Sequence, residues 1–345
     1  MDKFEIFFIS SLNLFLFYLI NLFLIKKEIL IDRKVDDEKH KSFINKNTVP
    51  LSGGLILFIN CIFLNFYDNF YHIYYFLGFF LIGLLSDTGK LNSPFKRLLL
   101  QILIVVIFLF FENINIESVR ISYLDQILEH KFFSIVFTTF CIVILVNGSN
   151  FIDGINFQSS GYYLALFTSL LLFGGELINQ INQEIFFSIY IFLWIFAFFN
   201  IQNKSFLGDA GIYLLSFIVG IILIKLQRIT NISPYFIVVL LWYPAFENLF
   251  SIIRKIFITK KKPDQADTLH LHHLLFKYLK LKFNYDDNKL SFLTSMIINL
   301  FNFSFFSIAS NFIYSTKILL FLTLVICLIY SFAYNFLFKI KKYEK

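Results

Sequence analysis

The sequence has few charged residues, few glycines and prolines, and only three cysteines. Of its 345 residues, 15% are charged and 58% are hydrophobic, whereas a soluble domain has about a quarter charged residues. This excess of apolar residues excludes a single water-soluble core, so lipid must solvate part of the surface. Cys61, Cys141 and Cys327 lie far apart, each within an apolar run. That spacing excludes a disulfide framework and indicates buried apolar residues rather than redox or metal chemistry.

The apolar residues are gathered in eleven runs, and a membrane-spanning helix needs about 20 such residues. Backbone groups in hydrocarbon must be satisfied within the segment, so the runs predict helices rather than open sheet. The first run, Phe4–Ile25, lacks a basic leader region and a small-residue cleavage site, and is expected to be a retained helix. The sequence thus predicts an all-α, polytopic transmembrane bundle forming one domain over residues 1–345. The expected spans are 4–25, 51–67, 70–86, 97–112, 132–147, 160–175, 184–200, 209–226, 235–253, 290–312 and 316–338.

The basic residues predict how this bundle is oriented. If the loop at 26–50 is cytoplasmic, eleven spans place 24 of the 30 Lys and Arg residues on that side and six on the other. The positive-inside rule then puts the amino terminus outside and the carboxyl terminus in the cytoplasm. The net charge of +7 comes from residues that flank apolar runs, which indicates topology signals and anionic lipid or phosphate partners, and no nucleic acid.

The polar segments that carry candidate chemistry all fall in loops of the predicted cytoplasmic face. Successive segments are separated by two spans, so they are expected to converge at one end of the bundle, while the loops of the other face show no comparable cluster. The five segments are 36–54, 86–97, 147–158, 203–211 and 254–289, the last with its polar core at 263–273.

Three carboxylates stand at the cytoplasmic ends of spans: Asp87, Asp153 and Asp209. A single acid beside glycine, as at Asp153 and Asp209, is equally well explained as a helix cap. Ionisable residues at membrane depth are costly and usually face a cavity or a partner, however. Three acids on one face, accompanied by Asn side chains, favour Mg²⁺ chemistry, in which the ion shares its oxygen shell with substrate phosphates.

The segment Asp267–His273 brings His270, His272 and His273 close together. Such a cluster can bind zinc, bind phosphate, or be a solvated loop. No Cys or HExxH pattern accompanies it, and the lysines at 260–262 favour an anion such as a diphosphate. His40, His72 and His130 stand alone and are assigned no function.

Taken together, these motifs resemble the polyprenyl-phosphate N-acetylhexosamine-1-phosphate transferase family. The resemblance covers about residues 36–275. In its number of spans and its His-Leu-His-His order, the sequence is similar to the family branch that primes O-antigen (lipopolysaccharide), enterobacterial common antigen or teichoic-acid linkage. The motifs that carry it are Lys46…Pro50-Leu51-Ser52-Gly53-Gly54, Gly83-Leu84-Leu85-Ser86-Asp87…Gln101, Asn147…Asn150-Phe151-Ile152-Asp153-Gly154, Phe206-Leu207-Gly208-Asp209-Ala210-Gly211 and His270-Leu271-His272-His273.

The resemblance implies a Mg²⁺-dependent transferase (with Mn²⁺ as the alternative ion) that takes a UDP-sugar and undecaprenyl (polyprenyl) phosphate and releases UMP. It implies a multi-pass enzyme of the bacterial inner membrane, with its active site on the cytoplasmic face, and allows a homodimer. Asp87 and Asp209 would be catalytic and lie beside the metal, with Asp209 the more direct ligand. The substrate-binding residues would be Lys46, Asn150, Asp153 and Asn156 for the nucleotide end, and His270, His272 and His273 for the diphosphate or sugar.

The chain departs from the family pattern at two positions. Ser86 stands where members commonly carry the first of two Asp residues, and Asn156 stands where many carry an Asp. The lost acid keeps open a catalytically inactive family member. A transporter or flippase of an anionic lipid or nucleotide sugar is the alternative from another class, although it would place polar groups near the midplane and show internal repeats.

Overall fold

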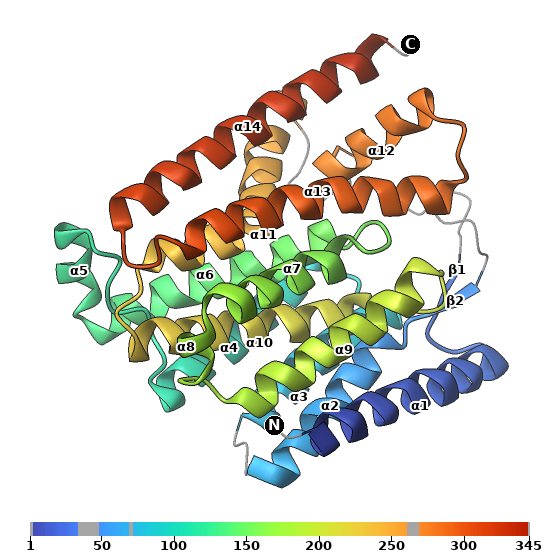
Figure 1. Ribbon diagram of the computed structural model, residues 1–345, viewed down its shortest axis with the longest axis horizontal. Coiled ribbons are helices and arrows are strands. Elements are labelled where there is room, and N and C mark those ends of the chain that lie inside the picture. Colours follow the sequence, from blue (N-terminus) through green and yellow to red (C-terminus); the bar gives the residue numbers. More distant parts are fainter. Residues whose placement is uncertain (1–2, 34–47, 69–71, 261–268, 344–345) are drawn as a thin grey trace.

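The computed structural model describes residues 3–33, 48–68, 72–260 and 269–343 (Figure 1). Each of the eleven apolar runs forms a helix, which confirms the helical prediction. The bundle helices are α1 (Lys3–Lys27), α2 (Gly53–Asp68), α3 (Ile73–Asp87), α4 (Pro94–Glu112), α6 (Lys131–Ile152), α7 (Gln158–Phe173), α9 (Gln183–Ile201), α10 (Gly208–Ile229), α11 (Pro234–Arg254), α13 (Asp287–Ser310) and α14 (Thr316–Tyr343).

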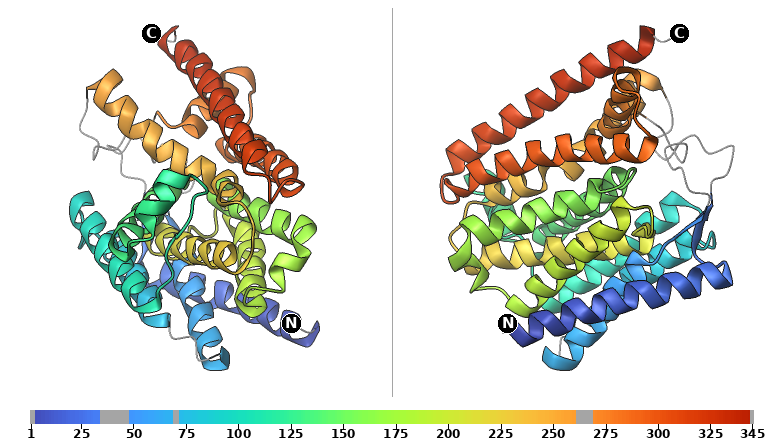
Figure 2. Two further views of the ribbon diagram at one scale, coloured as in Figure 1. Left: turned by 90° about the vertical axis from the view of Figure 1, so that its left-hand side faces the viewer. Right: turned by 45° about the vertical axis from the view of Figure 1, so that its right-hand side comes forward.

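Within the described ranges, eight of these helices are long and apolar enough to cross a membrane. The other three are shorter: α2 and α7 have 16 residues and α3 has 15. The chain is therefore a multi-pass membrane protein, while eleven crossings and their orientation remain predictions. The two ends of the described chain lie at opposite ends of the bundle (Figure 2).

The segments between the bundle helices contain structure that the apolar pattern did not predict. After α1, strand β1 (Ile31–Arg33) pairs antiparallel with β2 (Thr48–Pro50), with Asp32 opposite Val49. Short segments thus add a two-stranded sheet to the expected all-α fold. The remaining elements are α5 (Ser122–Leu128), α8 (Gly175–Ile178), a π-helix η2 (Lys255–Thr259) and α12 (Leu271–Lys282).

Helix α10 is the centre of the bundle, and Figure 2 shows it enclosed by the other helices. It packs against α3, α6 and α2, and the ring of Phe217 stacks on that of Phe79 at a centroid distance of 4.1 Å. Near its start the approach to α3 is closer still, because a Cβ atom on Gly83 would lie 2.3 Å from the Cα of Ala210. This contact brings the end of α3, and with it Asp87, against the first turn of α10.

Buried amides join helices that face lipid to the rest of the bundle. Asn13 of α1 and Asn60 of α2 exchange two hydrogen bonds, of 3.1 and 2.8 Å. Trp242 of α11 donates to Asn302 of α13 at 2.8 Å. Helices in a bilayer gain little from apolar contact with one another, so such bonds contribute to their association.

Candidate active site

Asp87 caps the amino terminus of α10. Its Oδ1 accepts the backbone N–H of Asp209 at 2.8 Å, and its Oδ2 accepts that of Ala210 at 3.0 Å. The first N–H groups of a helix have no partner within it and carry partial positive charge, so a carboxylate there is favourable. Gly208 makes the geometry possible, because its φ is +70° and a Cβ there would lie 2.7 Å from Asp87 Oδ2.

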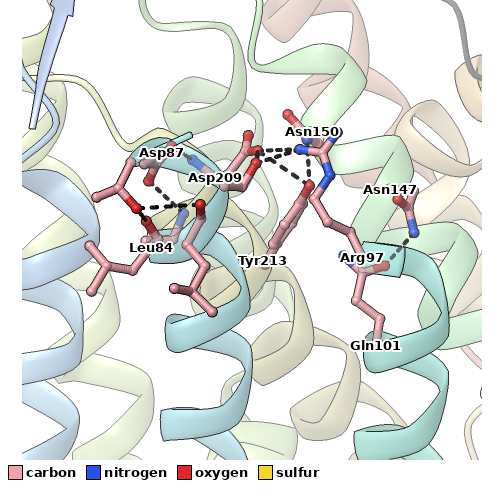
Figure 3. Close-up of polar contacts among 12 residues, drawn as sticks. Leu84, Asp87, Arg97, Gln101, Asn147, Asn150, Asp209 and Tyr213 are labelled. Carbon is pink, nitrogen blue, oxygen red and sulfur yellow. Dashed lines mark hydrogen bonds and ion pairs between the residues drawn. The ribbon is translucent and has the colours of Figure 1, made fainter. Parts of the chain in front are cut away.

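Asp209 lies beside Arg97 in the same site (Figure 3), and Ser86 contacts both residues. Its Oδ2 accepts the hydroxyl of Ser86 at 2.5 Å and Nη1 of Arg97 at 2.7 Å, and Arg97 also donates to Ser86 at 2.5 Å. The Arg97 and Asp209 side chains are 21% and 23% exposed, so this ion pair remains accessible to a ligand. Oδ1 of Asp209 accepts no hydrogen bond from the residues that the structure describes.

Asn150 reaches the same acid through a tyrosine. Its Nδ2 donates to the hydroxyl of Tyr213 at 3.0 Å, and that hydroxyl lies 3.4 Å from Asp209 Oδ2. One turn earlier on α6, Asn147 donates to Oε1 of the buried Gln101 of α4 at 2.8 Å. The start of α4, the end of α6 and the start of α10 are therefore joined by polar side chains (Figure 3).

Asp153 follows α6 directly and faces the two other acids. Its carboxylate accepts the hydroxyl of Ser159. Burial raises the pKa of Asp153 to about 7, and the charges of Asp209 and Asp87 add to this rise, although the Ser159 hydrogen bond opposes it. The carboxyl therefore changes its protonation state near neutral pH, which is suitable for a group in contact with a phosphate.

The three histidines form a buried cluster at the start of α12. The ring centroids of His272 and His273 are 4.2 Å apart, and each lies 5.8 Å from that of His270. His272 and His273 pack on the backbone at Gly154, next to Asp153. Both ring nitrogens of the fully buried His272 lack a hydrogen bond from the described residues. Burial, followed by the charge of His270, lowers the pKa of His272 to about 3, so its imidazole is neutral at physiological pH.

Two other residues proposed from the sequence are not seen at the acids. Lys46 falls outside the described residues, and Asn156 makes other contacts. Asn156 is buried in an amide chain, since its side chain donates to Asn203, which in turn donates to Asn288. Its backbone N–H donates to Ser291 at 3.1 Å, so this residue joins the segment after α6 to α13. Among the described contacts it has none with the three acids.

The sequence motifs predict no role for Arg97 or Tyr213, which contact Asp209. From the sequence, Arg97 contributes only to the count of basic residues on the cytoplasmic side, although it lies one turn before Gln101 on α4. Tyr213 lies four residues after Asp209, a spacing that places two side chains on the same helix face. Both spacings could have identified the residues.

The fold and this site define the class: a multi-pass membrane protein with carboxylates, an arginine and imidazoles gathered at one end of its bundle. A model of glycosyl transferase family 4 matches residues 69–227. This match and the relatives described next make the chain similar to members of glycosyl transferase family 4.

The chain is 26% identical over 268 residues to a probable undecaprenyl-phosphate N-acetylglucosaminyl 1-phosphate transferase of Bacillus subtilis (strain 168), covering 74% of this chain and 73% of that protein. It is 28% identical to an undecaprenyl-phosphate alpha-N-acetylglucosaminyl 1-phosphate transferase of Thermotoga maritima, covering 77% and 79%. A phospho-N-acetylmuramoyl-pentapeptide-transferase of Petrotoga mobilis is 26% identical, covering 68% and 77%.

Proposed function

We propose that this protein transfers an N-acetylhexosamine-1-phosphate from a UDP-sugar to undecaprenyl phosphate and releases UMP. The observation that carries the proposal is the meeting of Asp87, Asp153 and Asp209 with Arg97 and the imidazoles at one end of a membrane-embedded bundle. The names of the relatives support the same reaction. A site at the end of the bundle is accessible both to a water-soluble nucleotide sugar and to a phosphate carried on a lipid.

In this reaction an oxygen of the lipid phosphate forms a bond to the β-phosphorus of the UDP-sugar. The bond from that phosphorus to the bridging oxygen breaks, and UMP leaves with its electron pair. A phosphate monoester has a second pKa near 6, so the acceptor is largely dianionic at neutral pH and needs little deprotonation. The protein's task is then to orient two anions and to stabilise the charge that develops as the bond breaks.

The Ser86–Asp209–Arg97 contact explains how the site can work with one acid fewer. The Ser86 hydroxyl donates to Asp209 where a second carboxylate would repel it. Arg97 neutralises Asp209 in the absence of substrate and can donate to a phosphate oxygen when one enters. An arginine fork suits a phosphate because it offers several donors in one plane.

The site residues fit a magnesium ion that is held partly by substrate. Within the described residues, no three Asp, Glu, His or Cys side chains gather as a ligand set of their own. Mg²⁺ is commonly bound through one or two carboxylates together with substrate phosphates. Oδ1 of Asp209 is available for that role, and Asp87, already accepting two N–H groups, is adjacent. When bound, the ion would neutralise charge on the diphosphate.

We place the site on the cytoplasmic face of the bacterial inner membrane, with the amino terminus outside. The distribution of 24 basic residues against six supports this orientation. Variants with a single cysteine at residue 90 or at residue 120 test this orientation in intact cells. Only the cysteine at residue 120 should react with a reagent that cannot cross the membrane. The homodimer remains a prediction, which native mass spectrometry of the detergent-solubilised protein would test.

The experiment that tests the function measures UMP release by the purified protein with undecaprenyl phosphate, Mg²⁺ and a panel of UDP-sugars. We expect UMP and a lipid-linked sugar phosphate in equal amounts with at least one donor. A transporter would instead move nucleotide sugar into sealed vesicles without releasing UMP. Folded protein that releases no UMP from any donor would favour the inactive family member.

A further inference from the structure

Helix α11 carries a buried acid, Glu247, that the proposed reaction has not used. Its side chain is 1% exposed. Oε1 lies 2.9 Å from Nδ1 of His270, and Oε2 accepts the hydroxyl of Tyr330 of α14 at 2.6 Å. A buried carboxylate is very costly unless it is paired and hydrogen-bonded. The His270 contact therefore stabilises Glu247 and fixes the imidazole at the same time.

The backbone beside His270 is held by the same helix. Arg254, seven residues after Glu247, donates to the carbonyl of Leu269 and to the hydroxyl of Tyr334 at 2.6 Å. Because Arg254 is 1% exposed, this anchor is enclosed by protein. Residues 269 and 270 are thus attached to α11 at two points, so the ring of His270 has a defined place.

The other nitrogen of this ring remains available. Nε2 of His270 has no hydrogen bond from the residues that the structure describes, whereas Nδ1 is committed to Glu247. The ring lies 5.2 Å from that of Phe151, in the segment between Asn150 and Asp153. His270 therefore lies next to the segment that carries Asn150 and Asp153.

We propose that Glu247 is a positioning residue for the proposed transfer reaction: it keeps the proton on Nδ1 of His270 and directs Nε2 to a substrate phosphate. This inference rests on the proposed function. A carboxylate on one nitrogen selects the tautomer of a neutral imidazole and stabilises an imidazolium. In the imidazolium form, Nε2–H donates a charge-assisted hydrogen bond to the diphosphate as UMP leaves. The titratable groups that face Glu247 are His270 and His272 of the α12 segment, Tyr243 of α11 and Tyr330 of α14.

The test compares Glu247→Gln, His270→Gln, the double variant and Tyr330→Phe. Glutamine at 247 keeps the volume and removes the charge, while Tyr330→Phe removes the other hydrogen bond on the same carboxylate without altering the imidazole. We expect Glu247→Gln to lower kcat about 30-fold or more with KM for the donor within about threefold. The alkaline limb of its pH profile for kcat should also shift to lower pH, because the imidazolium has lost its counter-charge.

The double variant should be no slower than His270→Gln within about threefold, since two residues that act through one another are not additive. Tyr330→Phe should cause a smaller loss and leave the pH profile in place. Two results would overturn the proposal and indicate a structural role alone. One is a loss in the double variant equal to the product of the two single losses. The other is an equal loss of kcat in Glu247→Gln and Tyr330→Phe with an unchanged pH profile in both.

A spectroscopic measurement separates this inference from the proposed function. In protein labelled with ¹⁵N-histidine, the His270 signals are identified by their loss in His270→Gln. We expect a protonated Nδ1 in the wild type and its loss or exchange broadening in Glu247→Gln. An Nδ1 signal that is unchanged in Glu247→Gln would contradict the inference even if the enzyme is active. If the protein shows the expected signals but releases no UMP, the proposed reaction is wrong, while the effect of Glu247 on His270 stands.

Discussion

Asp87 accepts the backbone N–H of Asp209 at 2.8 Å, so one acidic residue of the site holds the peptide group of the other. Asp87 thereby has a structural role in addition to any role with substrate. Its position joins the last residue of α3 to the first turn of α10.

Asp87→Asn should therefore lower stability as well as activity. The asparagine oxygen can still accept one backbone N–H, but its NH2 group then faces the other N–H and cannot accept its hydrogen bond. We expect a loss of about 1–2 kcal/mol of unfolding free energy, as for a removed helix cap. Thermal unfolding in detergent measures it, with Thr88→Ala as the neighbouring control, because within the described part of the chain the Thr88 hydroxyl bonds only to carbonyls of its own helix end. A wild-type melting temperature in Asp87→Asn would exclude the capping role.

Asp209→Asn should have the opposite balance, with a large loss of activity and a small change in stability. The amide can still accept from Ser86 and Arg97, but it loses the charge that a Mg²⁺–diphosphate complex would meet. We expect UMP release to fall about 10³-fold, comparable to the removal of a major electrostatic group. Activity within a few-fold of wild type would contradict the assignment of Asp209 to the metal.

Ser86 can be altered in both directions. Ser86→Ala removes one hydrogen bond to Asp209 and should reduce kcat/KM about fivefold, equivalent to about 1 kcal/mol. Ser86→Asp restores a second carboxylate beside Arg97, and we expect it to lower the Mg²⁺ concentration needed for half-maximal activity. Magnesium titrations of the three proteins measure this, and the same requirement in all of them would show that position 86 does not influence the ion.

The raised pKa of Asp153 predicts a pH dependence of stability. An aspartate that titrates at about 7 when folded and at 3.8 when unfolded binds its proton more tightly in the native state. Its contribution to stability is fully present below pH 3.8, is lost progressively as the pH rises, and is gone above about 7. We expect the melting temperature of the substrate-free protein to fall between pH 5 and 7, and this slope to decrease in Asp153→Asn. Parallel curves for the two proteins would disprove it.

Two glycines of α3 form a matched pair for testing the packing of α10. A Cβ on Gly83 would meet the backbone of Ala210 at 2.3 Å, whereas a Cβ on Gly78 would meet only the end of the Ile104 side chain, at 2.7 Å. Because backbone cannot move aside, Gly83→Ala should destabilise by several kcal/mol or prevent folding, within the range for overpacking. Gly78→Ala should remain folded, and fluorescence-detected size exclusion compares the two. Equal behaviour would contradict the close approach of α3 to α10.

The sequence predicted the helices well because apolar length alone specifies a helix in lipid. Every expected run, from 4–25 to 316–338, is helical. It did not predict β1 and β2, because three-residue strands have no apolar periodicity to identify them. Their pairing depends on a contact between segments on either side of residues 34–47.

The site was predicted in part for a similar reason. Asp87, Asn150 and Asp209 stand at helix ends that the fold brings together. Asn156 carries the same kind of side chain, yet its partner is Asn203, 47 residues away, and nothing local to the sequence identifies that pairing. Glu247 was missed because a single acid within an apolar helix gives no motif, and only the structure shows the histidine beside it.

The burial of α10 has a consequence for how the enzyme responds to its surroundings. In the apolar 18-residue stretch of α10, 83% of the residues are buried within the protein, against 22% in α1 and 17% in α14. A bilayer that is too thick or too thin exerts its force first on the outermost helices, which can tilt at modest cost. Asp209 is carried by the most buried of the eight long apolar helices, so the site should keep its geometry in membranes of different thickness.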